Sequence, residues 1–203
     1  TELNESGLNK YFLQPSHYQG VLNRGSCTCS PISPYAYQHL TTWVEGLKKP
    51  SFSHLRLNQE KRLKSLLNYE GQDRFEVFFA PSGSDLVYFP LLFAKMLYPG
   101  RRITNLLTCP EELGSGTQIA AEGKYFMEEN QFGDAIPQGK RLSESLEVNT
   151  LHYKARGPEG KILYHKNQLL EDIQAHREDA LIGSLVIGSK SGIENNLNVI
   201  MEA

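Results

Sequence analysis

Residues 75–85 read FEVFFAPSGSD, an apolar run followed directly by small residues. The pattern predicts a strand over residues 75–80 and a loop that opens a helix. Small residues let main-chain N–H groups approach an anion closely, and the unpaired N–H groups of a helix's first turn point toward it. The stretch therefore indicates a phosphate site. The same residues also suit ordinary turn chemistry with Ser84 as an N-cap, and this second interpretation stays open.

Strands and helices are expected to alternate after residue 75. Apolar runs predict strands over residues 75–80, 103–108, 146–153 and 181–187, with a short one at 161–164. Helical patterns lie between them, over residues 85–98, 117–129 and 167–176. Continuous apolar strands that alternate with helices are typical of a parallel sheet covered on both faces. The fold class is therefore α/β, with three layers and a mostly parallel sheet. Pro90 predicts either a kink or a regular helix that begins near Phe89.

The first 70 residues differ from the rest of the chain. Residues 1–35 hold several prolines, glycines and serines without a sustained period, which is typical of an extended arm. Helices are expected over residues 35–47 and 58–67. We therefore divide the chain into an arm with helices at residues 1–70 and an α/β domain at residues 71–203. One continuous domain is the alternative.

Composition excludes several classes of protein. Hydrophobic residues make up 39% and charged residues 22%, as in ordinary folded proteins. A formal net charge of -2 gives no electrostatic footprint for nucleic acid or an anionic membrane. No apolar run approaches the roughly 20 residues that span a bilayer, and the first ten residues lack the apolar core of a secretory signal. A cytoplasmic protein is expected.

The three cysteines argue against a disulfide framework because their number is odd. Cys27 and Cys29 form a C-x-C pair, but a structural zinc site needs four ligands and only Cys109 remains. His17 and His39 are not spaced to complete such a site. We therefore expect reduced thiols and no metal.

Three predicted strand exits are polar and rich in small residues. They are residues 81–85, 109–112 and 188–192. Ligands of open parallel sheets bind beyond the carboxyl ends of the strands, so an anion at the first loop would have Glu111 or Glu112, Ser189 and Lys190 as possible neighbours. The alternative is that these loops are polar because most loops are.

The order of these motifs resembles a known family. Along the chain there follow one another a strand, APSGSD, a helix, a strand, TCPEE, GSGTQIAAEGKYF and an apolar strand ending in GSKSGIENN. This order resembles the first half of the large domain of fold-type I pyridoxal-phosphate enzymes, the aspartate aminotransferase superfamily. The resemblance covers about residues 70–203. It implies that pyridoxal phosphate is the cofactor and that an amino acid is the substrate.

The resemblance also implies roles for individual residues. Gly83 and Ser84, with Ser82 nearby, would hold the cofactor phosphate. Glu112 lies in the region that usually supplies the group over the pyridine ring, although this region carries no aromatic residue. Ser189 or Ser191 would lie near the phenolic oxygen of the cofactor.

The Schiff-base lysine and the acid on the ring nitrogen normally follow the point where this sequence stops. Lys190 follows an apolar strand and is a conceivable substitute, although exposed loop lysines usually serve solubility. We therefore expect a truncated or degenerate transferase of this type, with aminotransferase chemistry in an active full-length protein.

Open sheet edges predict association, most simply as a two-fold homodimer. The competing hypothesis is a non-catalytic α/β module that binds a phosphate-bearing ligand or a protein. A serine hydrolase is a weaker alternative, because PSGSD lacks the G-x-S-x-G elbow.

Overall fold

The computed structural model describes residues 4–9, 13–14, 31–46, 51–67, 75–130, 132–186 and 190–193. The chain divides into two compact units, Thr1–Val77 and Phe78–Ala203, and each is described by itself. No helix in the described ranges has the length and apolar character needed to cross a membrane.

The N-terminal unit contains two helices whose described residues include none that is buried. Helix α1 spans Pro34–Gly46 and α2 spans Phe52–Leu67. Serine hydroxyls cap both, because Ser33 Oγ accepts from Ala36 N at 3.1 Å and Ser51 Oγ accepts from His54 N at 3.2 Å. The predicted α1 is confirmed, whereas α2 begins six residues before the predicted start at residue 58 because Ser51 caps an additional N-terminal turn.

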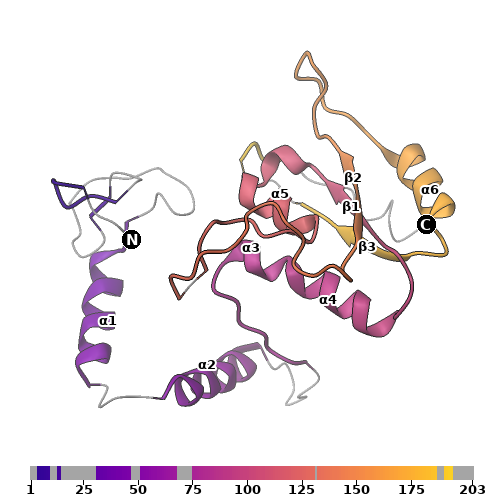
Figure 1. Ribbon diagram of the computed structural model, residues 1–203. Coiled ribbons are helices and arrows are strands. Elements are labelled where there is room, and N and C mark those ends of the chain that lie inside the picture. The colour runs from indigo at the N-terminus through magenta and orange to yellow at the C-terminus, as the bar shows by residue number, and fades with distance from the viewer. Residues whose placement is uncertain are drawn as a thin grey trace. The chain divides into compact units, whose positions relative to one another are not determined.

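The C-terminal unit is built on a parallel sheet (Figure 1). Its strands are β1 at Ile103–Thr108, β2 at Val148–Tyr153 and β3 at Ala180–Ser184, in the order β2-β1-β3. Ile103 of the central strand lies opposite Val148 on one side and Ala180 on the other. All six residues of β1 are buried, as a central parallel strand requires. The α/β fold class is confirmed.

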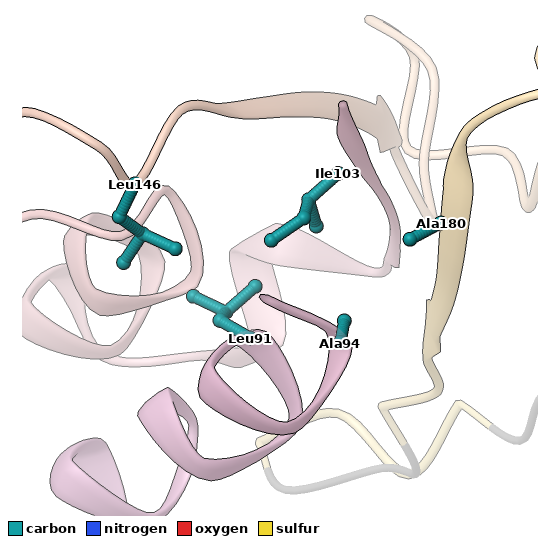
Figure 2. Packing of buried hydrophobic residues seen from close by; sticks show 5 residues of the cluster. All are labelled: Leu91, Ala94, Ile103, Leu146 and Ala180. Atoms are coloured by element: carbon teal, nitrogen blue, oxygen red, sulfur yellow. The ribbon is translucent and has the colours of Figure 1, made fainter. Parts of the chain in front are cut away.

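Helices cover both faces of this sheet. They are α3 at Gly83–Leu86, α4 at Tyr88–Leu97, the 3-10 helix η3 at Pro110–Glu112, α5 at Ser115–Ala121 and α6 at Lys166–Ala175. Figure 2 shows the α4 side, where Leu91 and Ala94 pack with Ile103, Leu146 and Ala180. Leu106 and Tyr153 pack with Leu169 of α6 in a separate cluster. Because successive strand residues face opposite sides, Ile103 and Leu106 place α4 and α6 on different faces.

At the start of the α/β region, the structure differs from one prediction and agrees with another. Residues 75–80, predicted as the first strand, form neither a strand nor a helix. The Phe78 ring instead lies 5.8 Å from that of Phe89 and 5.5 Å from that of Phe93. An apolar run satisfies the strand pattern, but a strand also requires a paired neighbour. Pro90 is the third residue of α4, where no intrahelical N–H bond is lost, which agrees with a helix that begins near Phe89.

Two further predicted elements are shorter in the structure. The helix expected over residues 117–129 ends at Ala121 because Gly123 has φ 71°, and a Cβ there would lie 2.9 Å from Val148 Cγ2. The short strand expected over residues 161–164 is reduced to one antiparallel bridge between Ile162 and Arg156.

Candidate functional site

The two connections between the strands leave the carboxyl edge of the sheet toward opposite faces. The connection from β1 to β2 contains α5, whose last residue accepts a hydrogen bond from Asn105 Nδ2 at 2.9 Å on the α4 side. The connection from β2 to β3 contains α6 on the opposite face. Strands whose connections leave to opposite faces open a crevice at their carboxyl ends, which is the usual ligand position in such sheets.

A strained residue turns the chain at the end of β1. Cys109 is buried and adopts the left-handed conformation, with φ 47° and ψ 52°. Its N–H donates to the Tyr153 carbonyl at 2.8 Å, so the turn is tied to the end of β2. Left-handed backbone is uncommon for a residue other than glycine and is held by its surroundings. The turn sends η3, with Glu111 and Glu112, across the carboxyl edge.

Glu112 connects the exits of β1 and β3. Its buried carboxylate accepts from Lys190 N at 2.6 Å, from Ser191 N at 2.8 Å and from Ser191 Oγ at 2.5 Å. The hydroxyl and N–H of Ser191, followed by Lys190 N–H, favour the ionised form and lower the pKa of Glu112. The carboxylate therefore closes a loop of its own chain.

The Lys190 ammonium is also engaged by the protein. Its Nζ donates to the Glu111 carbonyl at 2.9 Å and to the Leu113 carbonyl at 2.7 Å. An amine must be free to attack a carbonyl, whereas these two hydrogen bonds hold the Lys190 Nζ against the main chain of residues 111 and 113. The structure thus brings Glu112, Lys190 and Ser191 together, in contacts with one another and with η3.

The small-residue loop before α3 presents its two serines to different neighbours. Ser84 Oγ lies 2.8 Å from Thr117 Oγ1 in the first turn of α5. Ser82 Oγ instead donates to Asp85 Oδ2 at 2.6 Å and accepts from Asp85 N at 3.3 Å. Gly83 lies between them, and a Cβ built there meets no atom within 4 Å. Ser82 and Ser84 therefore have different hydroxyl partners, and the Cβ position of Gly83 between them is open.

Sequence reasoning did not single out Thr117 as a site residue. It lies in the GSGT run at residues 114–117, and that run of small residues at a helix start is the signal that indicates it. Ser189, Cys27, Cys29 and His17 lie outside the described residues. Within the described ranges, no group of three His, Cys, Asp or Glu side chains could hold a metal ion.

Together these features define a small parallel α/β unit with a polar carboxyl edge. No protein-family model, curated protein or solved structure matches the chain.

Proposed function

We propose that the C-terminal unit binds the phosphate group of pyridoxal phosphate, as the phosphate-holding part of a pyridoxal-phosphate-dependent transferase-like protein. The observation that carries this proposal is the pair of hydroxyls on Ser84 and Thr117, which come from two helix starts and lie 2.8 Å apart. One hydroxyl of the pair donates to the other, so the O–H of the second can donate to a phosphate oxygen, and the open Cβ position of Gly83 leaves room for the anion. Bound cofactor would supply an electron sink for amino-acid chemistry.

The residues fit the phosphate better than they fit the reactive ring. Lys190 and Glu112, the chain's candidates near the ring, are both engaged by the protein. We therefore assign Lys190 a structural role. Amino-group transfer would require a lysine and an acid other than Lys190 and Glu112. The engaged Lys190 also favours the second candidate function, a non-catalytic module that binds a phosphate-bearing ligand.

Association as a two-fold homodimer is part of the same proposal. Strands β2 and β3 each pair on one side only within the described sheet. Open edges of this kind favour pairing with another chain.

The test compares ligands that differ only in phosphate or aldehyde. Pyridoxine phosphate carries the phosphate without an aldehyde, so its binding does not depend on surface lysines. Isothermal titration calorimetry of the 203-residue chain should detect binding of pyridoxine phosphate and no binding of pyridoxine. Equal binding of both compounds, or of neither, would contradict the proposal.

A matched pair of variants locates the site. Gly83→Asp places a negative charge beside the hydroxyl pair and should weaken pyridoxine phosphate binding at least about tenfold. Gly83→Asn has nearly the same shape without the charge and should retain most of the affinity. Both side chains fit, since the Gly83 Cβ position is open.

A further inference from the structure

A pocket of about 470 Å³ lies beside α3. Its walls come from the starts of α3 and α4 and from the segment between α5 and β2. The residues that determine its chemistry are Ser82, Asp85, Tyr88, Tyr125, Phe126 and Glu129. A volume of this size suits a small organic molecule.

Main-chain hydrogen bonds hold the far wall in place. Tyr125 N donates to the Lys140 carbonyl at 2.9 Å, and Ile136 N donates to the Glu128 carbonyl at 2.8 Å. Gly139 N donates to the Tyr125 carbonyl at 2.8 Å. Hydrogen bonds within the segment thus hold it as an ordered loop, and the pocket is formed without a ligand.

Tyr88 fixes the near wall to this loop. Its hydroxyl donates to the Lys124 carbonyl at 2.7 Å, and its ring centroid lies 6.0 Å from that of Phe126. Burial, with a smaller contribution from the charge of Asp85, raises the pKa of Tyr88 to about 12. The tyrosine therefore stays neutral at physiological pH and presents an aromatic surface to the cavity.

The formal charges on the pocket wall are all negative. Asp85 and Glu129 contribute carboxylates, whereas no lysine, arginine or histidine lines the cavity among the described residues. The nearby Lys124 and Arg141 are paired elsewhere, with Glu122 at 2.6 Å and Glu147 at 3.2 Å. Glu129 forms no ion pair or side-chain hydrogen bond with the described residues. Its charge has no cationic partner there.

We propose that this pocket binds an organic amine, whose ammonium group lies against Asp85 and Glu129 and whose apolar body lies against the aromatic rings. Two carboxylates attract a cation and repel an anion. The faces of tyrosine and phenylalanine rings add cation–π attraction and an apolar surface. A phosphate or carboxylate ligand is excluded from the cavity by the same charges, so this site is independent of the proposed phosphate site.

Three probes of similar shape test the charge preference. Phenethylamine is cationic, phenethyl alcohol is neutral and 3-phenylpropionate is anionic. Titration of the full chain without pyridoxal phosphate, by calorimetry or ligand-observed NMR, should detect phenethylamine at millimolar or lower concentration. The anion should not bind, and the alcohol should bind at least about threefold more weakly than the amine. Absence of amine binding, or equal binding of amine and anion, would overturn the proposal.

Two neighbouring glutamates provide the matched variants. Glu129→Gln removes one pocket carboxylate and should weaken phenethylamine binding about threefold. Glu128→Gln makes the same change in net charge at an adjacent exposed residue outside the pocket and should leave binding unchanged. If the two variants behave alike, the amine binds elsewhere and the proposal fails. Because phosphate takes no part in this test, its outcome is separate from that at Gly83.

Discussion

The carboxyl edge of the sheet and the pocket beside α3 contain similar charged groups in opposite situations. At the edge, the Glu112 carboxylate accepts three hydrogen bonds and the Lys190 ammonium donates two, all within the chain. In the pocket, Asp85 is bonded only within its own turn and Glu129 lacks a side-chain partner among the described residues. A charge that is satisfied internally supports the fold, whereas a charge that faces a cavity is available to a ligand.

The comparison also separates two kinds of candidate residue. Sequence position placed Lys190 and Glu112 beside a ligand, since both follow strands at the expected edge. Their contacts assign them to loop closure instead. If this division is right, variants at the edge should change stability, and variants in the pocket should change binding.

The largest effect on stability is expected from Glu112→Gln. The amide offers one acceptor oxygen where the carboxylate offers two, and its NH2 group would face N–H donors. Calorimetry should show a Tm lower by on the order of 5 °C. Glu111→Gln is the matched control, because its amide oxygen can still accept from Arg156 N and its main-chain carbonyl is unchanged. An equal Tm for wild type and Glu112→Gln would contradict the role of Glu112 in stabilising the fold.

Acid should abolish the difference between wild type and Glu112→Gln. The pKa of Glu112 is lowered in the folded protein from its ordinary value of 4.5, mainly by Ser191. A lowered pKa means that the carboxylate stabilises the fold fully above pH 4.5 and loses this contribution as the pH falls through the folded pKa. The gap in Tm should therefore be constant from about pH 6 to 8 and close at lower pH. A gap that widens in acid would contradict the assigned contacts.

The smallest effect on stability is expected from Glu129→Gln. Its carboxylate has no partner to lose among the described residues, so the free energy of unfolding should change by less than about 0.5 kcal/mol. Urea titration measures this change in the same preparation that shows weakened phenethylamine binding. A loss of stability comparable to that of Glu112→Gln would show that Glu129 supports the fold, and the contrast between the two regions would disappear.

Local sequence patterns predicted the sheet well. Strands β1, β2 and β3 lie at three of the expected positions, although polar residues interrupt their apolar pattern and full burial is confined to β1. Helix ends were less predictable, although the signals were present. Ser51 before α2 and Gly123 after α5 are an N-cap and a left-handed stop that the apolar period alone does not reveal.

The remaining differences depend on contacts between distant residues. No local feature of residues 75–80 shows that they lack a pairing strand, because pairing is a property of the whole sheet. The pocket is similar in this respect. Asp85 and Glu129 are separated by more than 40 residues, and they share a cavity only because the segment after α5 folds back past α3.

Two claims are central: a phosphate binds beside Gly83, and Lys190 has a structural role. The most direct measurement treats the chain with pyridoxal phosphate, reduces it with borohydride and maps the adducts by mass spectrometry. We predict saturable binding that Gly83→Asp weakens and Gly83→Asn retains, with no preference for Lys190 over surface lysines. A dominant adduct on Lys190 would contradict the account, because it would show that this amine is free to react with the ligand.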